Sequence, residues 1–151
     1  MNIQSLNHSG LLVSDLEKTR WFYGTVLKME ELPRPATFKF PGAWFRSGAC
    51  EIHILLAPDL INSEGFGGER IQERPAFANH LAFEVSDFDA MVESIKQNGV
   101  EIKFGPISRG DGMMQLFVED PDRYLLEFFQ FVEGSEKGAP ERGAYTEKLE
   151  I

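Results

Sequence analysis

Short segments in which hydrophobic and polar residues alternate predict the strands of this protein, because side chains on a strand point alternately to its two faces. In the first such segment, Leu11 and Val13 share one face while His8 and Gly10 share the other. Strands are predicted over residues 3–13, within 29–57 with the last at 49–56, from residue 79 onward, and over 100–104, 113–118 and 124–131.

Two other segments place hydrophobic residues three and four positions apart, which is typical of an amphipathic helix. The first helix is expected to begin at a capping box, with Ser14 as the cap and Glu17 reaching back, and to extend to about Leu27. The second covers residues 87–98 and is closed by Gly99, a residue suited to a left-handed cap. The predicted apolar stripes are Leu16, Thr19, Tyr23 and Val26 in the first helix and Phe88, Met91, Val92 and Ile95 in the second.

The beginning of the chain is repeated after residue 78. Asn79-His80 matches Asn7-His8, and the Val-Ser-Asp segment that follows each pair occurs at the same relative position. The chain is therefore predicted to be one α+β domain built from two strand–helix–three-strand modules, β-α-β-β-β. The domain covers residues 1–133, its modules cover 3–57 and 78–132, a loop at 58–77 joins them, and residues 134–151 form a polar tail.

The last predicted strand holds a carboxylate, Glu127, between bulky hydrophobic residues, where it is costly to bury unless a cation or hydrogen-bond donors meet it. All three histidines fall on strand faces that the helices do not cover: His8 and His80 on the first strands and His53 on the fourth strand. Aligning the modules puts His53 opposite Glu127. Three imidazoles and one carboxylate suit Zn²⁺, Fe²⁺, Ni²⁺, Co²⁺ or Mn²⁺, so these four residues are the predicted metal ligands, with Glu51 left open as a substitute for His53.

Composition narrows the possible partners. The 151 residues carry a net charge of −9 without a basic stripe, which argues against nucleic acid and anionic membranes as main partners. The single cysteine, Cys50, allows no disulfide within the chain and fits a reducing compartment. No segment is apolar over a bilayer-spanning length, and the first residues lack the pattern of a signal peptide. We therefore expect a cytoplasmic protein without nucleic acid or membranes as main partners.

The chain resembles the vicinal oxygen chelate superfamily, which includes glyoxalase I, bleomycin-resistance proteins, extradiol dioxygenases and fosfomycin-resistance enzymes. The resemblance covers residues 3–131 and includes Leu6-Asn7-His8, Ile52-His53-Ile54-Leu55, Asn79-His80-Leu81 and Leu126-Glu127. It implies two modules paired as a cupped mixed sheet, with helices on the outer face and a divalent metal in the cup. Family members often dimerise, so a homodimer is expected, with the cup formed within one chain or from modules of two chains.

The resemblance implies an enzyme that chelates a substrate through two adjacent oxygens, as a lactoylglutathione-lyase-like isomerase or an extradiol-type dioxygenase. Glu127 is then the expected base, and His53 is expected as a ligand or as an acid/base residue. Glyoxalase I usually has a Glu at the position of His53, so one of its two acid/base carboxylates is absent. A drug-sequestering protein of the bleomycin-resistance type, without chemistry, is the alternative.

Residues that contact the substrate are expected around the same cup. Trp44, Arg46 and Glu51 are the candidates closest in sequence to His53, and Lys103 and Arg109 are further candidate cations for an anionic substrate. Two positions where the family usually has glycine hold Lys28 and Arg123. A left-handed backbone at Lys28 would cost about 1 kcal/mol.

Overall fold

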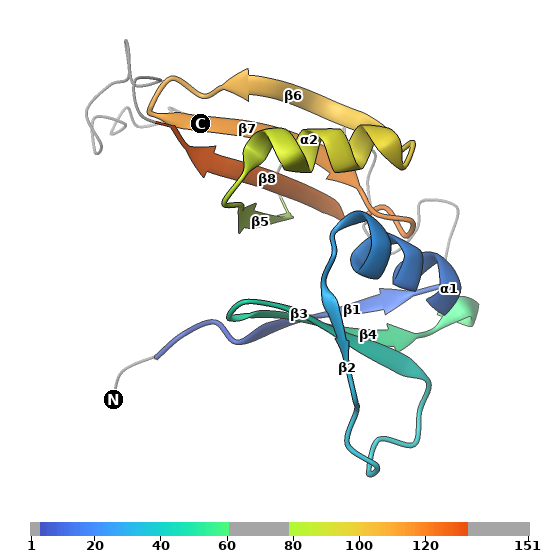
Figure 1. The fold of residues 1–151 in the computed structure, drawn as a ribbon. Coiled ribbons are helices and arrows are strands. Elements are labelled where there is room, and N and C mark those ends of the chain that lie inside the picture. Colours follow the sequence, from blue (N-terminus) through green and yellow to red (C-terminus); the bar gives the residue numbers. More distant parts are fainter. Residues whose placement is uncertain (1–3, 61–78, 133–151) are drawn as a thin grey trace, which may run out of the picture.

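The structure is a computed structural model and describes residues 4–60 and 79–132. The elements in chain order are β1 (His8–Val13), α1 (Leu16–Thr19), η1 (Arg20–Val26), β2 (Glu30–Leu32), β3 (Gly42–Ser47), β4 (Cys50–Leu56), η2 (Pro58–Leu60), β5 (His80–Glu84), α2 (Phe88–Gln97), β6 (Ile102–Ser108), β7 (Met113–Glu119) and β8 (Leu125–Phe131) (Figure 1). The predicted α+β fold of two β-α-β-β-β modules is confirmed. Apart from η2, the predicted loop 58–77 and tail 134–151 lie outside the described residues.

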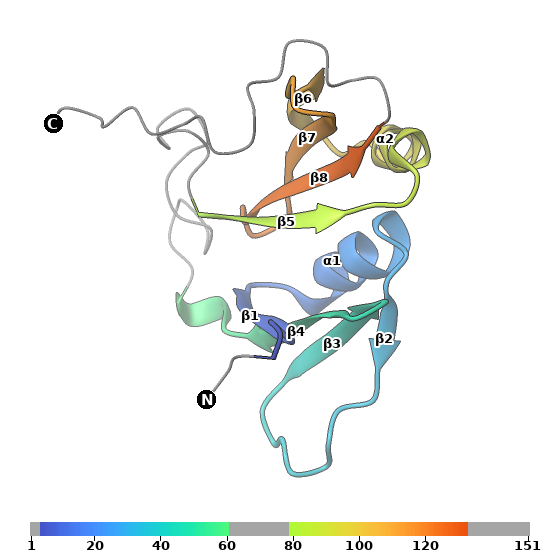
Figure 2. The same ribbon diagram turned by 90° about the vertical axis from the view of Figure 1, so that its left-hand side faces the viewer.

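The strands form two four-stranded sheets among the described residues, in the orders β1-β4-β3-β2 and β5-β8-β7-β6. The first strand of each module therefore lies at a sheet edge. No ladder of hydrogen bonds within these residues joins the sheets into the single cupped sheet that the family resemblance implied. In Figure 2 the first helix of the chain lies between the two sheets.

The pairing of the strands is the same in both modules. In the first, His8 lies beside Glu51 and Gly10 beside His53. In the second, the corresponding partners are His80 with Leu125 and Ala82 with Glu127. His53 and Glu127 consequently occupy equivalent places, in agreement with the alignment of the repeat.

The start of the first helix differs from the prediction. Asp15, not Ser14, is the N-cap: its side chain accepts hydrogen bonds from the backbone N–H groups of Glu17 and Lys18. The backbone N–H of Ser14 is used elsewhere, donating to Asp122 Oδ1 at 3.0 Å from the other module. Because this contact spans more than a hundred residues, the local capping pattern gave no sign of it.

Two strands also differ in length from the prediction. β1 begins at His8, five residues later than predicted, because its pairing with β4 begins there. β6 extends to Ser108 because β7 pairs with it across two irregularities. No helix in residues 4–60 and 79–132 is long and apolar enough to cross a membrane.

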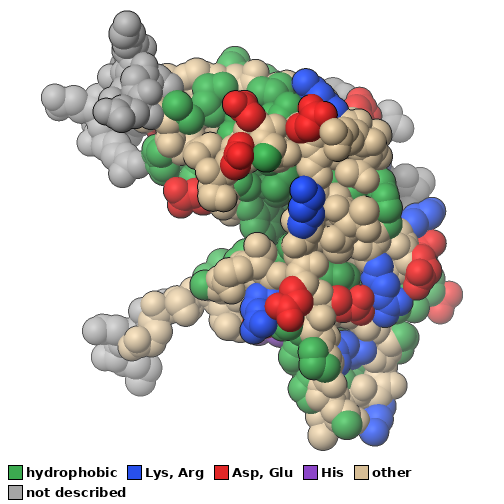
Figure 3. Space-filling view, in the orientation of Figure 1, with side chains coloured by type: hydrophobic (Ala, Val, Ile, Leu, Met, Phe, Trp, Pro, Cys, Tyr) green, Lys and Arg blue, Asp and Glu red, His purple; other side chains and the backbone are tan. Residues whose placement is uncertain are grey.

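The two modules enclose a cleft, seen at the left of Figure 3, with hydrophobic side chains inside it. A cavity of about 560 Å³ lies between the modules and is lined by residues of both, among them Leu27 and Met29 from the first and Phe83, Met91 and Phe128 from the second. The contact between the modules therefore leaves apolar surface open to solvent on this side.

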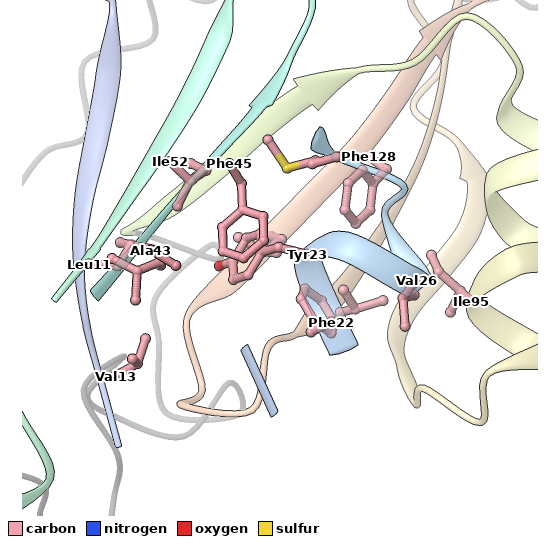
Figure 4. Close-up of a cluster of buried hydrophobic side chains, with 14 of the residues drawn as sticks. Leu11, Val13, Phe22, Tyr23, Val26, Ala43, Phe45, Ile52, Ile95 and Phe128 are labelled. Atoms are coloured by element: carbon pink, nitrogen blue, oxygen red, sulfur yellow. The ribbon is translucent and has the colours of Figure 1, made fainter. Parts of the chain in front are cut away.

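One hydrophobic core nevertheless joins the modules (Figure 4). Tyr23 of η1 is fully buried and stacks on Phe45 of β3 with ring centroids 5.7 Å apart, while Ile95 and Phe128 of the second module belong to the same cluster. The apolar strand faces and the predicted helix stripes pack here, as expected, except that Thr19 is buried without being part of the cluster. The opposite strand faces, which carry the histidines, consequently point away from this shared core.

Candidate functional site

The first half of the candidate site lies on the open face of the β1–β4–β3 sheet. The ring of His53 stacks between His8 and Trp44, with centroid distances of 4.0 Å on each side. His53 Nε2 lies 2.9 Å from Glu51 Oε2, and His8 Nδ1 lies 2.8 Å from Asn7 Oδ1. The side chains of His53 and Glu51 are largely buried, at 16% and 21% exposure. These contacts hold two imidazoles and a carboxylate together at one place.

The second half lies on the open face of the β5–β8–β7 sheet. Glu127 Oε2 is 3.0 Å from His80 Nε2, and the Glu127 side chain is only 8% exposed. Its other oxygen, Oε1, is buried without a hydrogen-bond partner in the described part of the chain. A buried carboxylate oxygen left unpaired is costly, and a bound cation would satisfy it. This observation and the donor set, imidazole nitrogen plus carboxylate oxygen, fit a divalent transition metal.

The four predicted ligands thus form two pairs and not one cluster. His8 and His80 line a common cavity of about 270 Å³ between the starts of β1 and β5. Even so, no group of three or more His, Cys, Asp or Glu side chains within residues 4–60 and 79–132 is placed to hold a metal. The planes of His8 and His53 are only 14° from parallel, so their in-plane nitrogen lone pairs do not converge. One of the two rings must rotate before both can bind one ion.

Trp44 lies inside the first half, whereas the predicted cations are engaged elsewhere. Arg46 is exposed and pairs with Glu30 at 3.1 Å. Lys103 pairs with Glu101 at 2.6 Å and lies 3.8 Å from Glu119. Each of these charges is therefore largely compensated within the module.

Arg109 is the predicted cation with an electrostatic connection to Glu127. Its pKa is raised above the ordinary value, mainly by the hydrogen bonds to Asp111 and also by the negative charge of Glu127. Arg109 and Asp111 lie in the turn between β6 and β7. The side chain is 42% exposed, at the rim of the second half.

Phe117 also belongs to the site, although it was not among the predicted substrate contacts Trp44, Arg46 and Glu51. Its ring centroid lies 5.4 Å from that of His80, in an edge-to-face arrangement. Phe117 is the cross-strand partner of Glu127, just as Trp44 is the partner of His53. Extending the internal repeat from the fourth strand to the third would have identified it.

The family assignment rests on comparison with known proteins. The Glyoxalase/Bleomycin resistance protein/Dioxygenase superfamily model matches residues 5–128, which include both halves of the candidate site. The chain belongs to this superfamily.

Individual relatives differ in what they do. The chain is 30% identical to lactoylglutathione lyase of Neisseria meningitidis over 142 residues, covering 89% of this chain and 96% of that protein. It is 32% identical to the fosfomycin resistance protein FosX of Listeria monocytogenes over 128 residues, covering 83% and 88%. A glyoxalase/dioxygenase structure from Nostoc punctiforme, 28% identical, has a TM-score of 0.73 and covers 87% of this chain and 94% of that one. Similarity over most of the chain thus extends to relatives with different names.

Proposed function

We propose that this superfamily member is a metal-dependent enzyme acting on a small molecule with two adjacent oxygens. The observation that carries the proposal is the buried Oε1 of Glu127, which has no hydrogen-bond partner among residues 4–60 and 79–132. Glu127 lies beside His80 and at the position equivalent to His53. A structural carboxylate would be expected to find donors, whereas a ligand keeps a lone pair for its ion.

The proposed ligands are His8 and His53 from one half and His80 and Glu127 from the other, for Zn²⁺, Ni²⁺, Fe²⁺, Co²⁺ or Mn²⁺. When bound, such an ion acts as a Lewis acid that stabilises negative charge developing on substrate oxygens. Glu127 is also the proposed base: its Oε1, once displaced from the ion, would take a proton while His80 stays at Oε2. Phe117 packs edge to face against His80, with ring centroids 5.4 Å apart, and so adds an apolar wall beside this carboxylate.

A second copy of the chain is proposed to complete the site. The two halves lie on sheet faces directed away from the core that the modules share, and strands β1 and β5 present unpaired edges among the described residues. A twofold-related copy can set its second half against the first half of its partner, forming two equivalent sites. A homodimer is therefore the proposed active form.

Two reactions fit this donor set. Lactoylglutathione-lyase-like isomerisation is supported by the Neisseria relative. Position 53 lacks the carboxylate that glyoxalase I usually has there, but the carboxylate of Glu51, 2.9 Å from Nε2 of His53, is a candidate to replace it. Extradiol-type dioxygenation is supported by the two-histidine, one-carboxylate set of His8, His80 and Glu127, which suits Fe²⁺. The metal found in the protein and its substrate would decide between them.

The first test is elemental analysis of protein purified without chelators. We expect about one transition-metal ion per chain in the wild type and loss of at least nine-tenths of it in His8→Ala and Glu127→Ala. Glu84→Ala, which removes an exposed carboxylate from β5, is the matched control and should keep its metal. A wild type that neither carries nor takes up a transition metal would overturn the proposal.

Turnover then separates the two reactions. Zn²⁺ or Ni²⁺ together with isomerisation of the hemithioacetal of methylglyoxal and glutathione would select the lyase. Fe²⁺ with catechol-dependent oxygen uptake would select the dioxygenase. In either case Glu127→Ala should lower kcat/KM by at least 100-fold, because it removes both a ligand and the base.

A further inference from the structure

Four buried side-chain atoms have no hydrogen-bond partner within residues 4–60 and 79–132: Nε and Nη2 of Arg34, Oε1 of Glu119 and Oε1 of Glu127. The two donors belong to the first module and the two acceptors to the second. A buried polar atom left unpaired destabilises a protein, so each one calls for an explanation. The proposed metal site explains Glu127. Arg34 and Glu119 remain, and they carry opposite charges and complementary atoms.

The unpaired nitrogens of Arg34 form one complete edge of its guanidinium group. The remaining nitrogen, Nη1, already donates to the carbonyl oxygens of Phe40 at 2.8 Å and Gly42 at 3.2 Å. Nε and Nη2 lie side by side, and this edge can hold a carboxylate by two parallel hydrogen bonds. No acceptor in the described part of the chain meets that edge. Arg34 thus keeps the donors that a carboxylate from outside the chain would use.

Arg34 lies on the same side of the first sheet as the proposed metal ligands. A Cβ on Gly42 would lie 3.4 Å from its guanidinium carbon, and Gly42 shares a strand face with Trp44. Ala43 and Phe45, at the alternate positions of β3, are 1% exposed in the core. The guanidinium group therefore lies at the open face, the side left for contacts outside the chain.

Two exposed aromatic rings accompany Arg34. Its guanidinium carbon lies 4.8 Å from the centre of the Phe40 ring and 5.7 Å from that of Phe38. Phe40 and Phe38 remain 44% and 41% exposed. The segment that carries them, between β2 and β3, extends away from the rest of the molecule at the bottom of Figure 1. Arginine and aromatic rings are the residues enriched at the centre of protein–protein interfaces.

Glu119 carries the complementary acceptor on the open face of the second sheet. Leu116 and Val118 of β7 belong to the shared core, so Glu119 points to the other face. Its Oε2 lies 3.8 Å from Nζ of Lys103 and 3.7 Å from Nε of Arg123, distances longer than a hydrogen bond. The side chain is only 11% exposed. Both cations lie nearest to Oε2, which leaves Oε1 to accept a hydrogen bond from another chain.

Strand register fixes the height of Arg34 along the first sheet. Arg34 donates to Gly42, whose cross-strand partner is Leu55. Leu55 lies two residues after His53 on β4, and each residue of a strand adds about 3.3 Å. Arg34 is therefore held beyond His53 in the direction of β4.

Glu119 lies on the other side of the equivalent position in the second module. Its cross-strand partner is Leu125, two residues before Glu127 on β8. In the proposed homodimer the free edges of β1 and β5 meet with both open faces on one surface, which requires equivalent strands to run in opposite directions. A position after His53 is then level with one before Glu127. This places Arg34 at the same height as Glu119 of the partner subunit.

We propose that Arg34 of each chain forms an ion pair with Glu119 of the partner subunit, with Nε and Nη2 donating to the carboxylate. The inference rests on the proposed function, because the homodimer that completes the site is part of it. Twofold symmetry gives two such pairs in each dimer. A second copy is the occupant that fits, since each chain offers both the donors and the acceptor that the other chain lacks.

Reversing either charge tests the ion pair. In Arg34→Glu both contacts of the dimer place two carboxylates together, and in Glu119→Arg both place two guanidinium groups together. Because like charges repel at such a contact, we expect the dimer Kd to rise at least about 100-fold in each variant. Analytical ultracentrifugation of the full chain measures the Kd, and circular dichroism checks that each variant is folded.

Combining the two variants shows whether the contact lies between chains. A dimer with one chain of each kind has one native pair and one pair with its charges exchanged, so both contacts attract. We expect an equimolar mixture of Arg34→Glu and Glu119→Arg to form this mixed dimer with a Kd within about tenfold of the wild-type value. Native mass spectrometry identifies it, because the two chains differ in mass.

Milder and control substitutions support the interpretation. Arg34→Lys keeps the charge and a donor for the carbonyl oxygens of Phe40 and Gly42 but lacks the two-nitrogen edge. It should raise the dimer Kd about tenfold, and it serves if Arg34→Glu does not fold. Lys96→Glu and Asp89→Arg reverse exposed charges on α2, away from the open faces, and should leave the Kd unchanged.

The outcomes separate this contact from the proposed function. A monomeric wild type would overturn the homodimer and the ion pair together. A dimeric wild type whose Kd does not change in Arg34→Glu and Glu119→Arg would overturn the ion pair alone. So would weakened variants that form no mixed dimer, because Arg34 would then act only within its own segment. Mixed dimers of a protein that takes up no metal would confirm the ion pair while the metal-dependent function fails.

Discussion

Lys28 has a φ of +56°, in the left-handed region that side chains other than glycine rarely adopt. It follows the C-terminal end of η1, at a position where glycine is usual in the family. Arg123, in the turn before β8, is in the same situation with a φ of +68°. At each point the chain reverses direction between two packed elements. Packing of these elements holds the residue in the left-handed conformation, even though its own backbone preference is against it.

Replacing Lys28 by glycine should therefore stabilise the protein. Glycine removes the left-handed strain of the folded state, and its greater flexibility in the unfolded chain offsets part of that effect. The expected net gain in the free energy of unfolding is up to about 1 kcal/mol. Urea unfolding measures the effect. Lys96→Gly, at an exposed position in α2 with ordinary helical geometry, is the control and should lose about 1 kcal/mol. Equal losses in both variants would show that Lys28 carries no strain.

At the scale of elements, the turn between β7 and β8 fastens the second module to the first helix and strand. The Tyr23 hydroxyl of η1 donates to Asp120 Oδ2 at 2.8 Å, and the backbone N–H of Leu12 in β1 donates to the Tyr124 hydroxyl at 3.2 Å. Burial raises the pKa of Asp120 to about 7, with a smaller rise from Asp122. It also raises the pKa of Tyr23 well above its usual value, so this hydroxyl keeps its proton.

The raised pKa of Asp120 makes stability depend on pH in a defined direction. Between about pH 4, where an unfolded aspartate titrates, and about pH 7, the folded protein holds one more proton than the unfolded chain. The contribution of Asp120 is thus fully present below pH 4 and declines as pH rises to about 7. Asp120→Asn keeps an acceptor for the backbone N–H groups of Asp122 and Tyr124 but cannot titrate.

We therefore expect Asp120→Asn to remove this decline. The free energy of unfolding, measured in urea at half-unit steps from pH 4 to 8, should fall less steeply in the variant than in the wild type. The difference between the two curves is the readout, because other carboxylates titrate in both. Asp89→Asn, at an exposed position in α2, is the control and should leave the curve unchanged. Parallel curves for Asp120→Asn and the wild type would refute the assignment.

At the scale of the whole molecule, the shared core decides where the two halves of the site point. η1 lies between the sheets, and Ser94 of α2 donates a hydrogen bond to the carbonyl oxygen of Val26 at 2.8 Å. The modules are thus held together through their helix-covered faces. The faces with His53 and Glu127 are left for contacts outside the chain, which is the physical basis of the proposed dimer.

Mixing inactive variants tests this arrangement. If each site takes its halves from two chains, unfolding and refolding His8→Ala together with Glu127→Ala gives hybrid dimers with one intact site. Random pairing should then restore roughly a quarter of the wild-type activity and metal content. If each site belongs to one chain, every chain carries a defect and mixing restores nothing. The separately refolded variants are the controls.

The sequence by itself determined the repeat, the type and approximate position of most elements, and the strand face on which His8, His53, His80 and Glu127 lie. These features follow from periodicities of two and 3.6 residues, which act over short distances along the chain. The equivalence of His53 and Glu127 could be predicted because the strands of each module pair in the same register. That the four residues share one metal ion stays a prediction.

Only the tertiary structure decided how the modules meet. Tyr23 and Asp120 are 97 residues apart in sequence, and neither alternation nor helical spacing relates them. The same long-range packing engages the backbone N–H of Ser14 with Asp122 of the other module. It also aligned the rings of His8, His53, Trp44, Phe38 and Phe40 in one row, because contacts between neighbouring strands depend on register and rotamer, which the order of residues does not reveal.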